Sequence, residues 1–203
     1  KNKKYYEQAR DCIDKILMLL EKYNIPATWA IVGHLFLQRC NPAKGGKHSD
    51  IPRSTYPWYS KDWFEQSPCT DDKEAPLWYG QDIVRKVINC SVHQEIASHS
   101  FAHILYGDEN TKRNTVRADL TNCVCEAGKF DIELKSFVFP RNTAGYVDEL
   151  NNFGFTAYRG IEPVWYRSFP KGLRKVCHMI DQLLSLCPPV SLPEYDQGLY
   201  NIP

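Results

Sequence analysis

Two histidines placed directly after a short apolar run are the residues of this sequence best suited to chemistry. His99 and His103 stand four positions apart in the segment EIASHSFAH. If the segment turns helically, side chains at this spacing point the same way, so both imidazoles could bind one metal ion. Ser100 between them is interpreted as a small spacing residue rather than as a nucleophile. Two ordinary polar residues at a strand end would give the same pattern. The surrounding elements must therefore show whether these histidines are metal ligands.

Helical and extended patterns alternate around this pair. We expect helices at residues 5–23, 80–89, 112–130, 145–154 and 171–186, and strands at residues 27–33, 95–98, 136–140, 155–160 and 189–194. This order predicts an α/β domain with parallel strands covered by helices. Functional residues of such folds lie at the C-terminal ends of the strands. Four candidates occupy such positions: His99, His103, Arg141 and Arg159.

A long segment without regular structure separates the first predicted strand from the second predicted helix. Residues 38–77 contain five prolines and two glycines, which interrupt any helix or strand. The segment also holds aromatic side chains, so we expect a packed loop over the mouth of a pocket rather than a disordered linker. Some aromatic residues in or beside this loop are candidates for stacking against a substrate, although interior packing explains them equally well. They are Trp58, Trp78 and Tyr79.

The composition is that of an ordinary globular protein. A length of 203 residues is enough for a sizeable core, and we expect a single domain over residues 1–203. A net charge of +1 gives no reason to expect nucleic acid as a partner, and no apolar run approaches the ~20 residues of a membrane span. The charged N-terminal residues lack the apolar region of a signal peptide, which favours the cytoplasm if Lys1 is the natural start.

Eight cysteines are dispersed along the chain without a CxxC pair. A chain of this size does not need disulfides to compensate for a small core, so reduced, buried thiols are the main expectation. A bridge involving Cys40 and Cys69 stays open as an alternative. Among the other histidines, His34 follows a predicted strand and fits a structural role, whereas His48 lies in the long loop and is expected to be solvated.

Three stretches of the sequence resemble the NodB-like polysaccharide deacetylases, in the order found in that family. They are IPATWAIVGHL, WYGQDIVRKVINCSVHQEIASHSFAHI and LKSFVFPRNTAGYVDELNNFGFTAYRG, and the resemblance covers residues 10–160. It implies a distorted (β/α) barrel with its active site at the C-terminal ends of the strands. The family's first and last motifs would lie before residue 1 and after residue 203, so we expect the barrel to be incomplete at both ends of this chain.

The resemblance also implies a hydrolase that removes an acetyl group from an N-acetylated sugar or polysaccharide. A divalent metal, usually zinc, is held in that family by an aspartate and by the two histidines of an HxxxH motif, which His99 and His103 match. Bound zinc lowers the pKa of water to about 7, which supplies hydroxide for attack on an acetamide carbonyl. The third ligand, an aspartate, is missing from this chain, and we expect the native chain to extend upstream through the strand that carries it.

The third family motif differs in this chain. Typical members have an arginine where FVFPRN places Val138, and Arg141 instead follows Pro140. The Arg141 backbone N–H could stabilise a developing oxyanion and its guanidinium could reach a sugar, while a surface charge at a loop end explains it equally well. Arg159 is a candidate for substrate binding, and an ion pair with Glu162 would let it shape the pocket.

Two functions of other classes remain open. The missing aspartates favour a carbohydrate-binding domain without catalytic activity. The same scaffold also supports an amidase that acts on small nitrogenous metabolites. Metal content and activity separate the hydrolase from the binding domain, and acetylated sugars compared with ureides separate it from the amidase.

Overall fold

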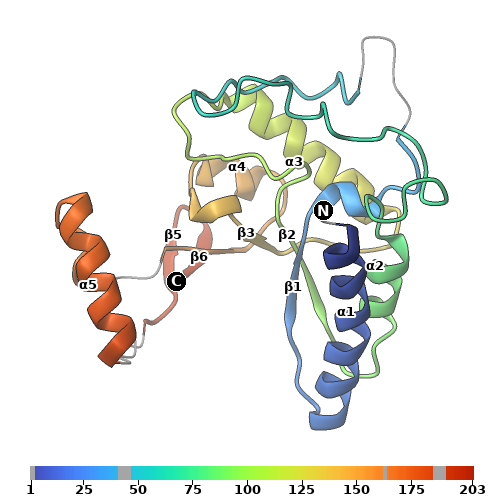
Figure 1. The fold of residues 1–203 in the computed structure, drawn as a ribbon, viewed down its shortest axis with the longest axis horizontal. Coiled ribbons are helices and arrows are strands. Elements are labelled where there is room, and N and C mark those ends of the chain that lie inside the picture. Colours follow the sequence, from blue (N-terminus) through green and yellow to red (C-terminus); the bar gives the residue numbers. More distant parts are fainter. Residues whose placement is uncertain (1–2, 41–46, 162–163, 185–190) are drawn as a thin grey trace.

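A six-stranded, mostly parallel sheet organises the computed structural model, which describes residues 3–40, 47–161, 164–184 and 191–203 (Figure 1). The first four strands pair in parallel and in chain order: β1 (Thr28–Ile31), β2 (Glu95–Ser98), β3 (Ser136–Val138) and β4 (Ala157–Arg159). Next to β4 come β6 (Leu199–Ile202), which is parallel to it, and β5 (Glu194–Asp196), which is antiparallel to β6. The strand order β1-β2-β3-β4-β6-β5 confirms the α/β prediction, and the sheet is open over these residues.

The helices lie where the apolar periodicity predicts them. The α-helices of the described residues are α1 (Lys3–Tyr23), α2 (Gln81–Ile88), α3 (Arg113–Gly128), α4 (Val147–Asn152) and α5 (Lys171–Leu184). Two short 3₁₀ helices follow β1 and β3, namely η1 (Gly33–Phe36) and η2 (Pro140–Asn142). The predicted helices are therefore confirmed, with differences only at their ends.

The end of the chain differs from the prediction. The strand expected at 189–194 begins outside the described residues, and residues 191–193 are not in a strand. Instead β5 and β6 form a hairpin whose turn holds Gln197 and Gly198 at φ values of 50° and 84°. Two consecutive residues with positive φ match the twist of paired strands. The hairpin thus depends on a turn that an alternating apolar pattern does not reveal.

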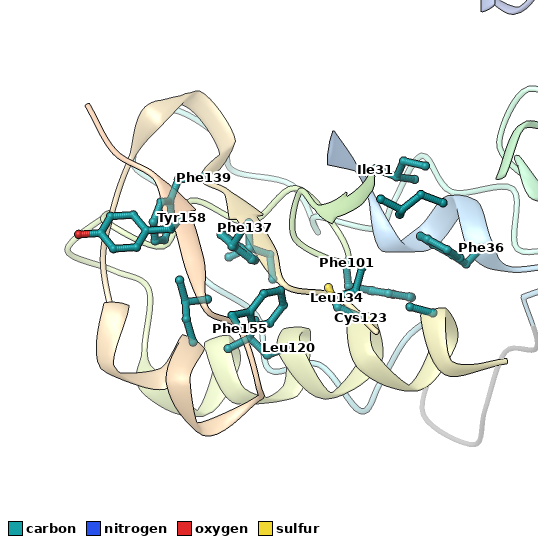
Figure 2. Packing of buried hydrophobic residues seen from close by; sticks show 14 of the residues in the cluster. Ile31, Phe36, Phe101, Leu120, Cys123, Leu134, Phe137, Phe139, Phe155 and Tyr158 are labelled. Atoms are coloured by element: carbon teal, nitrogen blue, oxygen red, sulfur yellow. The ribbon is translucent and has the colours of Figure 1, made fainter. Parts of the chain in front are cut away.

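Helix α3 supplies the surface on which the centre of the sheet packs. Its buried apolar side chains are Val116, Leu120, Cys123 and Ala127. Figure 2 shows Leu120 and Cys123 next to aromatic residues from β3, β4 and their flanking segments. The ring centroid of Phe137, in β3, is 4.9 Å from that of Phe139 and 5.6 Å from that of Phe155. Burying each such side chain contributes about 1.5–3 kcal/mol, so α3 and β3 are held firmly together.

Two helices contribute little to this core. Leu17 is the buried residue of α1, and Cys177 is buried on α5. Figure 1 shows α5 standing apart from the sheet. None of the helices in the described part of the chain combines the length and the apolar character that crossing a bilayer requires. The sheet, α3 and the connecting loops are therefore the framework available for a site.

An ion-pair cluster links α3 to α4. Glu149 of α4 is buried, and its carboxylate accepts hydrogen bonds from Arg117, at 2.9 Å, and from Arg113. These arginines, led by Arg117, hold the pKa of Glu149 at about 2, against an ordinary value of 4.5. Because the folded-state pKa is depressed, the stabilisation is complete above pH 4.5 and is lost as the pH falls toward 2.

We expect Glu149→Gln to lower the free energy of unfolding by about 1.5–3 kcal/mol at pH 7, because charge-assisted hydrogen bonds of a buried group are lost. The difference from wild type should shrink between pH 4.5 and pH 2, where the wild-type carboxylate is itself protonated. Urea denaturation at pH values from 2 to 7 measures the free energy of unfolding of both proteins. Asp148→Asn is the control, because Asp148 pairs with the same Arg113 but is exposed, and it should cost less than about 1 kcal/mol. Equal losses in the two variants would contradict the prediction.

Candidate functional site

The segments that follow β1 and β2 are joined to each other at the C-terminal edge of the sheet. Gly33 N donates to Ser100 O at 2.8 Å, and His34 N donates to Phe101 O at 2.9 Å. A Cβ atom at Gly33 would lie 2.9 Å from the Cα atom of Phe101, so only glycine permits this approach. The polar residues that follow these two strands are therefore held in one place.

His99 and His103 lie side by side, as their spacing predicts. Their ring centroids are 4.9 Å apart and their planes are inclined by 73°. His99 Nδ1 lies 2.8 Å from Val138 O, and because a carbonyl only accepts, Nδ1 carries the proton and Nε2 keeps its lone pair. Two imidazoles bound to one zinc ion at Zn–N distances of about 2.0–2.1 Å have ring centres roughly 5 Å apart. The separation of the two rings is therefore compatible with a shared metal ion.

Both imidazoles are held in the neutral form. Burial lowers the pKa of His99 below its ordinary value of 6.5, although the bond to Val138 opposes the shift. Burial also lowers the pKa of His103, and the nearby His99 and Arg141 lower it further. Since a metal binds the neutral imidazole, neither side chain has to lose a proton first at pH 7.

The chain between the two histidines is not the helical turn expected from the sequence. It bends sharply, and Ser100 and His103 have φ values of 65° and 58°. Asp119 of α3 is the reason, because its buried carboxylate accepts hydrogen bonds from the backbone N–H groups of Phe101, at 2.9 Å, and Ala102, at 3.1 Å. These groups bond to a side chain instead of to the carbonyls of a helix.

Asp119 has two further partners in the same segment. Its carboxylate accepts from Ser100 Oγ at 3.0 Å and from Tyr106 OH at 2.8 Å. Ser100 Oγ in turn accepts from Ile104 N at 2.9 Å, so the hydroxyl is committed to holding the bend, which agrees with a spacing role. Burial raises the pKa of Asp119, and its hydrogen bonds offset only part of the shift. Asp119 was not predicted as a site residue, although an acidic residue on the apolar face of a predicted helix was a usable signal.

A cavity of about 510 Å³ opens beside His103. This volume is in the range of about 300–1,000 Å³ that small-molecule sites occupy. One wall comes from the loop at residues 38–77 and consists of Trp58, Tyr59, Trp63, Phe64, Gln66, Ser67 and Leu77. The loop therefore lies over the pocket, as the sequence predicts.

Two contacts hold this loop against the strand ends. Trp63 Nε1 donates to Ala102 O at 2.6 Å, which places the loop on the bend between the histidines. The guanidinium of Arg141 lies over the ring of Trp58, 4.6 Å from its centroid, and Trp58 stacks on Tyr56 with centroids 5.3 Å apart. A cation over an aromatic face is attracted by the ring quadrupole. Arg141 is thus part of the cavity wall, and its own backbone has a φ of 53°.

The remaining predicted residues have different placements. Trp78 lines the cavity and is 41% exposed. Tyr79 is only 1% exposed and does not line the cavity; its hydroxyl donates to Thr70 O at 2.7 Å, so it holds the loop instead of facing a substrate. Arg159 is exposed in β4 and is not among the residues that line the cavity. Its expected partner Glu162 lies outside the described residues.

Two polar groups in the cavity wall have no hydrogen-bond partner within the described part of the protein. His34 Nδ1 lies 3.3 Å from Trp78 O, while His34 Nε2 and Ser67 Oγ are buried and unpaired. Burial lowers the pKa of His34, so its ring is neutral and one nitrogen can accept a hydrogen bond. Buried polar atoms without partners cost free energy, and a polar ligand would remove that cost. His34 was expected to be structural, and its place in the wall also suits ligand binding.

The histidine pair could supply two metal ligands, whereas a catalytic zinc site has three from the protein. Within the described ranges no three His, Cys, Asp or Glu side chains are grouped so that they could hold a metal ion. Comparison of the chain with family models, with curated proteins and with solved structures gives no match. A function must therefore be inferred from the arrangement of these residues and from the sequence resemblance.

Proposed function

We propose that this chain is the hydrolase domain of a NodB-like deacetylase, which removes an acetyl group from an N-acetylated sugar or polysaccharide. The observation that carries the proposal is the pair of neutral imidazoles, His99 and His103, at the edge of a cavity lined with aromatic rings. The open sheet would be the larger part of the distorted (β/α) barrel of that family.

His99 and His103 would hold a divalent metal ion, zinc by the resemblance, together with an aspartate from an upstream strand. Zinc supplies hydroxide from water near neutral pH. The Val138 carbonyl fixes the tautomer of His99 and orients its ring, as the outer partners of metal-binding histidines commonly do. The bend fixed by Asp119 then brings His103 to the same position.

Arg141 is placed to act on the substrate. It lines the cavity with His103, and the face of Trp58 holds its guanidinium there. Its backbone N–H, in the turn after β3, is a candidate donor to the oxygen that gains negative charge when an acetamide carbonyl is attacked. Its positive charge also disfavours protonation of His103, which keeps that imidazole available as a ligand.

The cavity wall suits a sugar ring. A sugar presents apolar C–H faces, which pack on aromatic rings, and hydroxyl or amide groups, which need polar partners. Trp58, Tyr59 and Trp78 supply aromatic faces. His34 Nε2 and Ser67 Oγ supply polar atoms that are otherwise unpaired.

A carbohydrate-binding domain without catalytic activity is the second candidate. It is favoured by the histidine pair having no third metal ligand among the described residues. The same aromatic wall would then bind a sugar that the protein does not cleave. An amidase that acts on ureides would use the imidazole pair but would have less use for several aromatic faces.

The three functions are separated by one set of measurements. The native chain, including the upstream strand that the proposal requires for the third ligand, is incubated with zinc and with N-acetylated sugar oligomers of increasing length, and free acetate is quantified. The proposal expects acetate release that a chelator stops and that added zinc restores. Calorimetric binding of the oligomers without acetate release would favour the binding domain, and ammonia release from ureides would favour the amidase. If the protein neither bound a sugar nor released acetate or ammonia, all three functions would be overturned.

We expect His99→Ala and His103→Ala, each made in the full-length native chain, to weaken zinc binding by at least about 10–100-fold, because a directly bound imidazole is lost. The fold should survive, since the buried core does not include either ring. Elemental analysis after dialysis against buffered zinc measures the effect, and His93→Ala, on an exposed residue, is the control. Wild-type metal content in both variants would show that the assignment of these ligands is wrong.

We expect Asp119→Asn to weaken zinc binding by about 10–100-fold although Asp119 touches no metal, because the bend that pairs the histidines loses its acceptor. The asparagine amide would also point a donor at other donors, which costs about 1–3 kcal/mol of folding free energy. Glu126→Gln, on the same helix but paired with Lys129 near the surface, is the control for both readouts. A variant that is destabilised but binds zinc like wild type would show that Asp119 does not position the histidines.

A further inference from the structure

Cys40 and Cys69 meet within the loop at residues 38–77, which lines the cavity. Their sulfur atoms are 2.7 Å apart, and no other pair of cysteine side chains is in contact among the described residues. Except for Leu77, the loop residues of the cavity wall lie between the two cysteines in the sequence, from Trp58 to Ser67. A covalent bond at this point would therefore enclose most of the loop wall of the cavity.

The backbone holds the two cysteines opposite each other without help from the sulfur atoms. Cys40 N donates to Thr70 O at 2.8 Å, and the backbones of Arg39 and Asp71 pair in an antiparallel β-bridge. The buried Tyr79 hydroxyl donates to Thr70 O at 2.7 Å and accepts from Thr70 N at 3.1 Å. The ends of the loop are thus already ordered, so the thiols can react with little further loss of chain entropy.

We propose that Cys40 and Cys69 are a redox-active pair whose disulfide locks the loop over the cavity and whose reduction loosens it. The proposal does not depend on the hydrolase function, because it concerns the wall of the cavity and not the chemistry inside it. A crosslink that closes a loop of this length stabilises the folded state chiefly by restricting the unfolded chain. It also favours the closed position of the aromatic residues between the two cysteines.

Formation of the disulfide needs an acceptor for two electrons, and a low-molecular-weight disulfide such as oxidised glutathione supplies it. The thiolate of Cys69, which is partly exposed, attacks the small disulfide, forms a mixed disulfide and releases one small thiolate. Cys40 then loses its proton and attacks the Cys69 sulfur, which releases the second small thiolate. The two released thiolates take up the two protons of the cysteines, so protons and electrons balance.

His48 is the polar group beside the buried member of the pair. Its Nε2 lies 3.3 Å from Cys40 Sγ, and its ring packs against His34 and Phe64, which corrects the expectation of a solvated side chain. Burial and the neighbouring Cys69 raise the pKa of Cys40 to about 12, and burial lowers the pKa of His48 to about 4. Both groups are therefore neutral in the reduced protein near pH 7, so the imidazole adds no charge beside the buried thiol.

The experiment compares the wild-type protein after equilibration with oxidised glutathione and after reduction with dithiothreitol. Peptide mapping by mass spectrometry should find Cys40 joined to Cys69 in the oxidised sample. That sample should melt about 5–15 °C higher, and trypsin should cut after Arg53 and Lys61 at least about 10-fold more slowly. Cys69→Ser should abolish all three differences, and Cys125→Ser, on an exposed position of α3, should leave them unchanged.

Three outcomes would overturn the proposal. The first is that Cys40 and Cys69 stay unlinked in folded protein treated with oxidised glutathione. The second is that the link forms but changes neither melting temperature nor loop cleavage, because the bond would then not control the loop. The third is that both thiols become reactive only after a chelator is added, since metal thiolates would then explain their contact. The comparison of oxidised with reduced wild type needs no variant, so a substitution that impairs folding does not affect it.

Discussion

The buried carboxylate of Asp119 is the interaction on which the candidate site depends. Four donors of the segment after β2 converge on it, namely Ser100 Oγ, Phe101 N, Ala102 N and Tyr106 OH. A carboxylate has about four acceptor positions, so these groups are all satisfied only when the chain bends around it. A helical turn here would leave a charged group unpaired in the core, which is among the most costly arrangements in a protein. Helix α3 thus sets the separation of the two histidines.

The aromatic core positions the two groups that hold the histidine pair in place, namely the Asp119 carboxylate and the Val138 carbonyl. Asp119 is carried by α3 and the Val138 carbonyl by β3, and both elements bury a side chain, Leu120 and Phe137, in the same hydrophobic cluster. One partner therefore fixes the path of the chain to His103 and the other fixes the ring of His99. Because dense cores resist displacement, packing several residues away fixes the geometry of the histidine pair. The polar residues at the surface of the site would not fix the geometry of the histidine pair without this core.

Local patterns in the sequence were sufficient to predict the helices and strands, but not the hydrogen-bond partners that side chains find in distant segments. The helices and the first four strands follow from apolar periodicity, which each segment carries by itself. The approach of His99 to His103 was also predicted, but from a helical turn, since nothing near Ser100 reveals a carboxylate that comes from another element. Tyr79 shows the same limit, because an aromatic residue beside a loop looks alike in sequence whether its hydroxyl faces a ligand or the Thr70 backbone. In both cases the structure differs from the prediction because of hydrogen bonds between residues far apart in the sequence.

The histidine pair and the cavity share one segment of chain, and this links the energetics of any ligands that bind to them. The bend between His99 and His103 also accepts the Trp63 indole at Ala102 O, and Trp63 belongs to the loop wall. A ligand that orders the loop therefore stabilises the bend, and the metal ion proposed for the histidine pair would stabilise the docking surface of the loop by ordering the bend. By reciprocity, each should bind more tightly when the other is present, by the same factor. The size of that factor depends on how mobile the loop is when the cavity is empty, since an already ordered loop leaves little for either ligand to gain.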